Sequence, residues 1–192
     1  MNTLTPSLPS ASSVLVEGER FPARELPTLS GTGVVVPDPR GALVHLQLRR
    51  YAGCPICSFH LRSFARRHDE LLAANVREVA VFHSSAAELR KVHTELPFDV
   101  VPDPDRRLYA ELGVGTSARA VLDPRAWRAA ARAVRAKASR DPRAGMADGS
   151  FGLPGDFLIA PDGRVLAFKR GVHADDQWSV DELLAHASEG AR

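Results

Sequence analysis

The chain has 192 residues, of which 44% are hydrophobic and 25% are charged, and its formal net charge is +2. This length is enough to bury one full core, and it favours one domain with an insertion over two separate domains. The small net charge does not point to nucleic acid as a partner, and no run of about 18 apolar residues predicts a membrane span. The N-terminus lacks the basic start and apolar run of a secretory signal, so we expect a cytoplasmic protein.

Residues 1–13 are rich in Ser, Thr and Pro and predict a mobile N-terminal tail. We expect residues 14–192 to form a single domain. Its first part, up to Val36, contains short β-like pieces interrupted by Gly and Pro, which predict an N-terminal β extension. The run Val44–Leu48 then predicts the first central strand.

The motif Cys54-Pro55-Ile56-Cys57 follows this strand and contains both cysteines of the chain. Pro55 suits the first position of a helix, so Cys54 is expected near a helix N-terminus, where unsatisfied N–H groups and the helix dipole favour the thiolate. Cys57, one turn further on, is then placed to attack a mixed disulfide formed at Cys54. Arg49 and Arg50 precede the motif, and at most one of them can face the thiols, because successive strand residues point to opposite faces.

The cysteine pair has two other interpretations. A structural zinc site needs a second pair of ligands at similar spacing, and none follows, so we expect neither a metal nor another cofactor. Two inert cysteines are the other alternative, because free cysteine is common in protein cores. In a reducing compartment, a Cys-x-x-Cys pair indicates catalysis or redox sensing more than a structural disulfide.

Helical and strand-like patterns alternate after the motif. They predict helices and strands at Cys57–Ala74, Val76–His83, Ser85–Leu96, Asp103–Leu112, Asp156–Ala160, Val165–Lys169 and Val180–Ala187. The strands are the second, fifth and sixth of these segments, and the last two strands form a hairpin. This order predicts an α/β domain with a central mixed β-sheet flanked by helices.

Residues 116–151 predict a helical insertion before the hairpin. Its helix is expected over Arg125–Ser139, with a weak apolar stripe of Trp127, Ala130, Ala131, Val134 and Ala138 and a strongly basic face. We expect the insertion to roof the active site and to select an anionic substrate or an acidic protein surface. A solvated helix without a partner is the alternative. Nucleic acid is not expected, because aromatic residues are not interleaved with the basic ones.

Three segments carry a resemblance to a known family, namely Arg50–Cys57, Val101–Asp105 with Tyr109, and Gly152–Gly163. On these residues the chain resembles the thioredoxin-like superfamily, and within it the peroxiredoxin-like branch related to alkyl hydroperoxide reductase and thiol-specific antioxidant proteins. The resemblance implies a thioredoxin-like fold. It also implies a cis-proline at Pro154, which would turn the backbone of Leu153 toward an extended substrate beside Cys54.

The chain departs from the peroxiredoxin pattern at the residues that bind a peroxide. That pattern is Pro-x-x-x-Thr-x-x-Cys with an arginine before the hairpin strand. Counting back from Cys57, the Thr and Pro positions hold Cys54 and Arg50, and counting back from Cys54 gives neither residue type either. Pro154 stands at the expected arginine position. Both supports for efficient peroxide reduction are therefore missing.

We therefore expect a dithiol–disulfide oxidoreductase in which Cys54 attacks a disulfide or an oxidised small molecule and Cys57 resolves the product. The partner would be a thiol reductant, either thioredoxin-type or of low molecular weight, and the assembly is either a monomer or a homodimer. One alternative is a thiol peroxidase working through a Cys54 sulfenic acid. Another is a redox-inert interaction module on the same scaffold. Tyr51 either packs beside the motif or offers its hydroxyl to a substrate.

Overall fold

The computed structural model describes residues 15–190, so the tail predicted for residues 1–13 lies outside the described residues. A five-stranded sheet forms its centre, with the strand order β5-β4-β3-β6-β7. The strands are β3 (Leu43–Arg49), β4 (Val76–Phe82), β5 (Asp99–Pro102), β6 (Gly155–Ile159) and β7 (Val165–Arg170). The first three are parallel, and β6 and β7 run antiparallel to their neighbours. The predicted mixed sheet and its terminal hairpin are thus confirmed.

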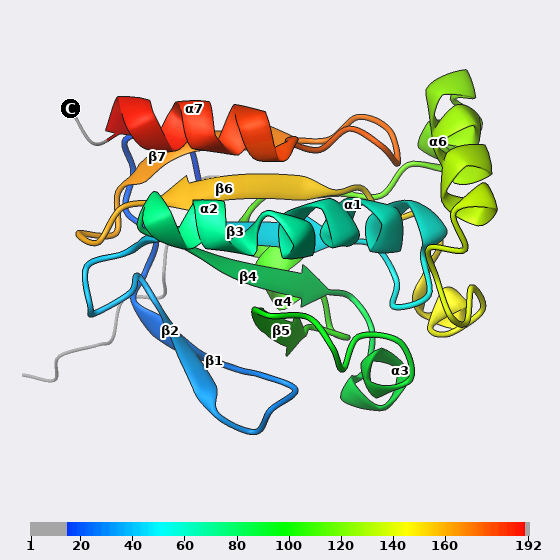
Figure 1. Cartoon of the computed structure of the whole chain (residues 1–192), viewed down its shortest axis with the longest axis horizontal. Helices are drawn as coiled ribbons and strands as arrows, with labels where there is room; N and C mark the ends of the chain where they lie inside the picture. Colours follow the sequence, from blue (N-terminus) through cyan, green and yellow to red (C-terminus); the bar gives the residue numbers. More distant parts are fainter. Residues whose placement is uncertain (1–14, 191–192) are drawn as a thin grey trace, which may run out of the picture.

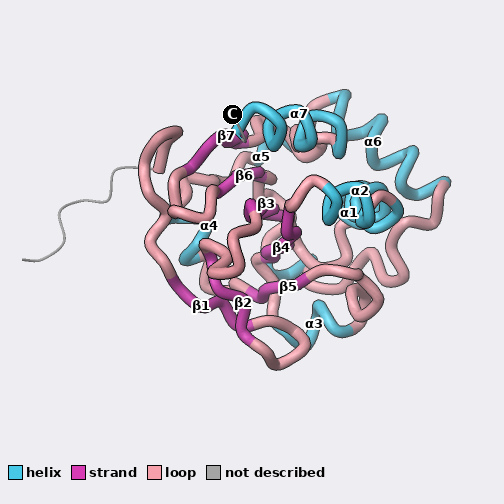
Figure 2. Tube along the Cα trace, turned by 60° about the vertical axis from the view of Figure 1, so that its left-hand side comes forward, coloured by secondary structure: helices cyan, strands magenta, loops and turns pink. Residues whose placement is uncertain are grey.

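Helices cover both faces of this sheet (Figures 1 and 2). On one face lie α1 (Pro55–Arg66), α2 (His68–Ala73) and α7 (Val180–Gly190). On the other face lie α4 (Arg107–Glu111) and the small antiparallel sheet of β1 (Arg24–Pro27) and β2 (Gly33–Val36), which is the predicted β extension. The remaining elements are α3 (Ala86–Arg90), α5 (Ala118–Val121), α6 (Pro124–Arg135) and the short helix η1 (Met146–Asp148).

The central strand β3 separates two chemically different layers. Val44, Leu46 and Leu48 pack in the apolar core beneath α4 and the β1–β2 hairpin. The alternating residues His45, Gln47 and Arg49 point to the opposite face and are also fully buried. The face below α1 and α7 therefore contains polar groups that need partners inside the protein.

One predicted helix is much shorter in the structure. The segment predicted as Ser85–Leu96 is helical only over Ala86–Arg90, although Ser85 caps it as expected by accepting a hydrogen bond from the Glu88 backbone N–H (3.3 Å). Beyond α3, the ring of His93 donates from Nε2 to the carbonyl oxygen of Ala52 (2.7 Å), which draws this segment toward the cysteine motif. This tertiary contact competes with continuation of the helix.

The other two long helical predictions also need correction. The segment predicted as Asp103–Leu112 is helical only over α4. Asp103 precedes this helix, and its carboxylate accepts hydrogen bonds from the backbone N–H groups of Arg107 (3.0 Å) and Leu108 (2.9 Å) in the first turn. The helix predicted to run through residue 74 is split into α1 and α2 at Arg67, whose backbone is not helical. None of the helices in residues 15–190 is both long and apolar enough to span a bilayer.

The insertion helix α6 packs beside the N-terminal part of α1 (Figure 1), but its buried stripe differs from the predicted one, of which Ala138, just beyond α6, is buried and Ala130 is partly buried. Ala126, Ala129 and Ala133 are buried, whereas Trp127 and Val134 are 64% and 63% exposed. The prediction weighted the large apolar side chains. The structure instead uses alanines at i, i+3 and i+7, because small side chains allow the two helices to approach closely.

Candidate active site

The Cys54-x-x-Cys57 motif lies at the carboxyl end of β3, where the chain enters α1. Cys54 is the N-cap residue of α1, and its Sγ accepts a hydrogen bond from the Cys57 backbone N–H at 3.4 Å. Pro55 occupies the first turn of the helix. Both cysteines are free, and the Sγ of Cys57 donates to the Sγ of Cys54 across 2.9 Å. One turn of helix thus holds the two sulfur atoms in contact.

The surroundings of Cys54 favour its thiolate. Burial by itself raises the pKa of this thiol, but the hydrogen bond from Cys57, the charge of Arg50 and the backbone N–H groups of Cys57 and Ile56 outweigh burial and lower the pKa to about 6. For Cys57 the same burial and the adjacent Cys54 sulfur raise the pKa well above its ordinary value. At neutral pH these shifts favour the thiolate form of Cys54 and the protonated form of Cys57.

Arg50, rather than Arg49, faces the thiols. Its Nη1 lies 3.7 Å from the Cys54 Sγ, its Nη2 donates to the carbonyl oxygen of Ser150, and the guanidinium lies over the ring of Tyr51 at 5.6 Å. Arg49 is fully buried in the polar layer below α1 and α7, where its guanidinium donates to Gln47, Gln177 and Asp156. Arg50 is thus the arginine beside the Cys54 sulfur, in agreement with the expectation that at most one of Arg49 and Arg50 would face the thiols.

A pocket of about 510 Å³ opens beside Cys54, and we call it the Cys54 pocket. Its wall consists of Arg50, Tyr51, Cys54, Pro55, Ile56, Ala126, Trp127, Ala130, Met146, Ser150 and Ala174. Cys54 lines this pocket, although its side chain is fully buried. Tyr51 is also part of the wall, and burial raises the pKa of its hydroxyl, which therefore stays protonated.

The insertion is tied directly to the cysteine loop. The backbone N–H of Gly53 donates to the carbonyl oxygen of Ala144 at 2.7 Å. The side chain of Arg62 on α1 donates to the carbonyl oxygens of Ala136 (3.2 Å) and Lys137 (2.9 Å), which form the C-terminal end of α6. These contacts place the insertion over the motif, where five of its residues belong to the pocket wall.

The prediction of a cis bond before Pro154 is wrong. Among residues 15–190 the only cis peptide bond is Val36–Pro37, so Leu153–Pro154 is trans. The backbone N–H of Leu153 already donates to the carbonyl oxygen of Gly115 (3.0 Å), and Pro154 is buried. Neither residue belongs to the wall of the Cys54 pocket. The backbone of Leu153 is thus engaged within the protein and is not directed at a substrate beside Cys54.

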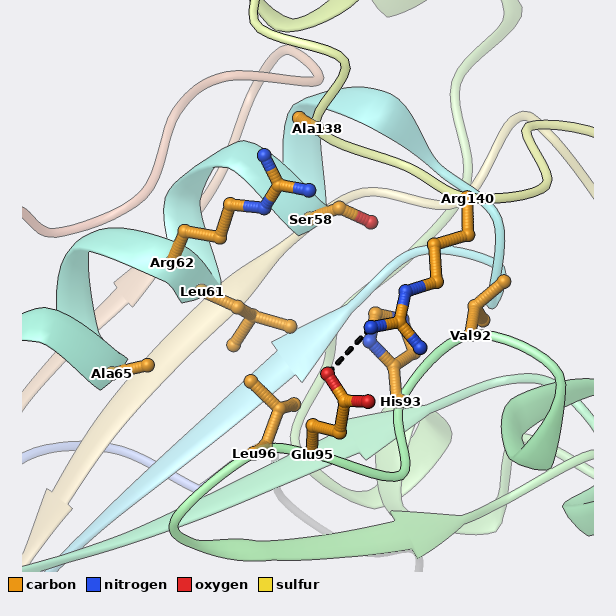
Figure 3. Close-up of a pocket in the computed structure, with 10 residues that line it drawn as sticks. All are labelled: Ser58, Leu61, Arg62, Ala65, Val92, His93, Glu95, Leu96, Ala138 and Arg140. Atoms are coloured by element: carbon orange, nitrogen blue, oxygen red, sulfur yellow. Dashed lines mark hydrogen bonds and ion pairs between the residues drawn. The ribbon is translucent and has the colours of Figure 1, made fainter.

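A second pocket, of about 170 Å³, lies along another face of α1 (Figure 3). The helix contributes Ser58, Leu61, Arg62 and Ala65 at helical spacing. An ion pair between Arg140 and Glu95 (2.5 Å) lies beside it, and His93 on its wall holds the carbonyl oxygen of Ala52. Burial lowers the pKa of His93 to about 4, so the ring is neutral at pH 7. No cysteine lines this pocket, and its contact with the cysteine loop is the hydrogen bond from His93 to Ala52.

Sequence reasoning missed a buried polar network beneath α1. The carboxylate of Asp156 on β6 accepts hydrogen bonds from His45 Nε2 (3.1 Å), Arg49 Nη2 (3.0 Å) and the Trp178 backbone N–H (3.0 Å). Glu78 on β4 accepts from His45 Nδ1 at 3.0 Å. The alternation of polar residues along β3 was the available signal, but their burial depends on α1 and α7 packing over them.

Charge balance stabilises this network. Burial lowers the pKa of His45, but Glu78 and Asp156 outweigh it, so that the pKa is raised. For Asp156, burial is outweighed by Arg49 and His45, and its pKa is lowered. The network also anchors the segment that carries Trp178. His60 on α1 donates to the Trp178 carbonyl oxygen (2.6 Å), and burial lowers the pKa of His60 to about 3, so this histidine is structural.

Among the described side chains, no three His, Cys, Asp or Glu residues gather into a group that could hold a metal ion. The reactive groups beside the pocket are therefore the two thiols, with Arg50 as the nearby cation. Such an arrangement can form and break disulfide bonds, and a thiolate of this kind can also attack a peroxide.

Solved structures similar to this chain share its fold. A protein from Chlorobium tepidum, described as a thiol:disulfide interchange protein DsbE, is 21% identical, with a TM-score of 0.59 over 90% of this chain and 99% of that one. Peroxidoxin BcpB from Mycobacterium tuberculosis is 16% identical, with a TM-score of 0.60 over 90% and 96%. AhpC from the same organism is 16% identical, with a TM-score of 0.62 over 93% and 94%. The fold of this chain is therefore thioredoxin-like, as expected.

No curated protein matches the chain. The model of the family described as AhpC/TSA antioxidant enzyme matches residues 63–172, which is more than half of the sequence. The matched region runs from the middle of α1 to just beyond β7, so it covers the scaffold and begins after both cysteines. On this match, and with its thioredoxin-like fold, the chain belongs to the AhpC/TSA antioxidant enzyme family.

Proposed function

We propose that the protein is a dithiol–disulfide oxidoreductase that uses Cys54 as the nucleophile and Cys57 as the resolving thiol. The observation that carries the proposal is the contact of the two sulfur atoms, 2.9 Å apart, with the pKa of one thiol lowered and that of the other raised. Such a pair needs no rearrangement of the backbone to form a disulfide. Similarity to a protein described as a thiol:disulfide interchange protein is consistent with this chemistry.

The reaction proceeds in two displacements. The Cys54 thiolate attacks one sulfur of a disulfide R–S–S–R′, forming a Cys54–S–S–R mixed disulfide and releasing R′S⁻. Cys57 then loses its proton to the released thiolate or to water and attacks the Cys54 sulfur, which releases RS⁻ and leaves a Cys54–Cys57 disulfide. The substrate has gained two electrons, and a dithiol reductant of thioredoxin type or of low molecular weight returns them to the protein.

The site orders these two steps. Burial, the hydrogen bond to Cys54 and the charge of the Cys54 thiolate all raise the pKa of Cys57 in the resting protein. When Cys54 enters the mixed disulfide, its charge disappears and two of these three causes disappear with it. The Cys57 pKa then falls, so the resolving thiol becomes reactive only after Cys54 has captured a substrate.

Thiol peroxidase activity is the second candidate, and membership of the AhpC/TSA antioxidant enzyme family favours it. In that reaction, the Cys54 thiolate would attack one oxygen of a peroxide ROOH, which breaks the O–O bond, releases ROH and forms a sulfenic acid. Cys57 would then displace water from the sulfenic acid and leave a Cys54–Cys57 disulfide. The donors to the Cys54 sulfur are the Cys57 thiol and backbone and Arg50. No threonine hydroxyl of the described residues joins them, and this is why we rank disulfide reduction first.

Two steady-state assays on the same protein separate these candidates. One follows reduction of insulin disulfides, and the other follows consumption of hydrogen peroxide and an alkyl hydroperoxide, each with a dithiol reductant. We expect disulfide reduction that is lost in Cys54→Ser, and slow peroxide turnover. Fast peroxide turnover without disulfide reduction would reverse the order.

The third candidate, a redox-inert interaction module, rests on the complete burial of Cys54. Alkylation with iodoacetamide at pH 7 tests it directly, because a buried thiol without access through the pocket stays unmodified. We expect rapid modification of Cys54, since its thiolate belongs to the pocket wall. We also propose that the protein works in a reducing, cytoplasmic environment, which keeps the dithiol available.

A further inference from the structure

The wall of the Cys54 pocket is mostly apolar. Ile56, Ala126, Trp127, Met146 and Ala174 surround its volume of about 510 Å³. A space of this size and character suits an organic molecule of moderate size, and pockets for such ligands typically measure about 300–1,000 Å³. A small polar molecule would leave most of this apolar surface in contact with water, so the wall favours a substrate with an apolar body.

Arg50 adds a charge requirement to this pocket. The residue is only 5% exposed, and among the described side chains no carboxylate forms an ion pair with it. Its near neighbours are the Cys54 sulfur and the carbonyl oxygen of Ser150, and its buried Nε has no acceptor. The Cys54 thiolate is thus the anion that balances the guanidinium in the resting protein.

Formation of the mixed disulfide removes that anion. The sulfur of Cys54 becomes neutral, and Arg50 is left as a buried cation without a counter-ion, which is an unfavourable state inside a protein. A substrate that brings its own anionic group close to its sulfur would restore the balance. A carboxylate fits this need well, because it accepts charge-assisted hydrogen bonds from a guanidinium.

The surroundings of the pocket also favour anions. The insertion contains eight Arg and Lys residues but only three Asp residues, a net charge of +5, so the rest of the chain carries −3. On α6, Arg125, Arg128, Arg132 and Arg135 form an exposed basic stripe beside the alanines that pack on α1. The same helix contributes Ala126, Trp127 and Ala130 to the pocket wall, and positive charge on it raises the local concentration of anionic substrates.

From the apolar wall and the charge of Arg50, we propose that the substrate is a small organic disulfide that combines an apolar, preferably aromatic, body with a carboxylate close to the sulfur. The proposal rests on the disulfide reductase activity proposed above and names its substrate class. The electron count is the same: Cys54 and Cys57 together supply two electrons, the S–S bond of the substrate breaks, and two carboxylate-bearing thiols leave.

Three symmetrical disulfides test this substrate class with the reduced full-length protein. 3,3′-Dithiodibenzoate has both features, 3,3′-dithiodibenzamide keeps the aromatic body without the charge, and dithiodiacetate keeps the carboxylate without the aromatic body. The second-order rate constant of thiol release is measured by stopped flow in single turnover. Each value is divided by the rate constant of a simple free thiolate with the same disulfide, which removes differences in intrinsic reactivity.

We expect the normalised rate constant for the dibenzoate to exceed those of the other two disulfides by about tenfold or more, as one charge-assisted hydrogen bond allows. In Arg50→Met the preference for dibenzoate over dibenzamide should fall to within about twofold. Because this ratio is taken within one variant, a changed Cys54 pKa cancels. Arg50→Lys retains the charge and should keep a preference, so the test does not depend on one variant that folds poorly.

Two substitutions at exposed positions, one on α1 and one on α6, serve as controls. Arg66→Met removes an exposed arginine of α1, and Val134→Ala removes an exposed apolar side chain of α6 outside the pocket wall. Both should leave the ratios unchanged, whereas Trp127→Ala should reduce the advantage of the aromatic disulfides. Equal normalised rates for all three disulfides in the unmodified protein would overturn the inference alone. No thiol release from any of them would overturn the proposed function and the inference with it.

Discussion

Replacing Arg50 by Met is the most informative perturbation of the thiolate. The surroundings lower the pKa of Cys54 from 9.0 to about 6. Three pKa units correspond to about 4 kcal/mol of preference for the thiolate. A unit charge about 4 Å away contributes up to about 4 kcal/mol at an effective dielectric constant of about 20. Because the hydrogen bonds from Cys57 and from the helix N-terminus stay in place, we expect the variant's pKa to rise by about 1–2 units.

This shift changes the whole pH profile of reactivity rather than one rate. A thiol with a pKa near 6 is about 90% ionised at pH 7, and one with a pKa near 8 is about 10% ionised. The more basic thiolate is intrinsically more nucleophilic, by about six- to tenfold for a shift of about two units. The two effects nearly cancel at pH 7. The variant should therefore react at a similar rate near neutrality and faster than the unmodified protein above pH 9.

The assay is the rate of iodoacetamide alkylation of Cys54 between pH 4.5 and pH 10, together with thiolate absorbance near 240 nm. Arg66→Met, which removes an exposed arginine at the C-terminal end of α1, provides the control, and its profile should match that of the unmodified protein. A midpoint that stays at the same pH in Arg50→Met would refute the assignment of this arginine to the thiolate. The profiles would then have to be explained by the helix N-terminus and Cys57 alone.

Two further substitutions and one pH effect have outcomes that follow from the same geometry. Cys57→Ala should raise the Cys54 pKa, because the Cys57 hydrogen bond is the largest lowering cause, and should trap substrate as a mixed disulfide visible by mass spectrometry. Asp156→Asn leaves Arg49 and His45 without their shared anion, which should reduce stability by about 3–5 kcal/mol and the melting temperature by about 6–20 °C. Because the pKa of His45 is raised by folding, its contribution to stability is complete at low pH and is lost as pH rises through that folded-state pKa.

Each of these expectations has a contrary result. Release of substrate by Cys57→Ala without added thiol would show that another group resolves the mixed disulfide. The exposed Asp69→Asn is the control for Asp156→Asn, and similar melting temperatures for the two variants would remove the buried network from the account. For His45, a flat dependence of unfolding free energy on alkaline pH, or one that rises, would contradict the charge balance derived above.

Local patterns in the sequence predicted the parts of the site that depend on neighbouring residues. The strand before the motif, the placement of Cys54 at a helix start and the terminal hairpin all follow from features within a few positions of one another. Pro55 illustrates the point, because its fixed φ and missing N–H suit only the first turn of the helix. These features needed no knowledge of distant contacts.

Features that depend on tertiary packing could not be predicted in the same way. The sequence allowed either Arg49 or Arg50 to face the thiols. In the folded sheet, Arg49 at the end of β3 binds Asp156 on β6, and Arg50 lies beside Cys54. The trans bond at Pro154 depends on pairing of Leu153 with Gly115 across the insertion. The buried alanine stripe of α6 depends on how closely α1 approaches, which no pattern within the helix reveals.

The central claim is that Cys54 and Cys57 form one reversible two-electron couple within a single turn of helix. Equilibration of the protein in a series of dithiol redox buffers, with acid quenching, alkylation and peptide mapping by mass spectrometry, tests it most directly. The account predicts one transition in which both cysteines become resistant to alkylation together and a Cys54–Cys57 disulfide appears. The control variant Arg66→Met should show the same transition. Two cysteines that stay reduced in the most oxidising buffer, or that oxidise independently of each other, would contradict it.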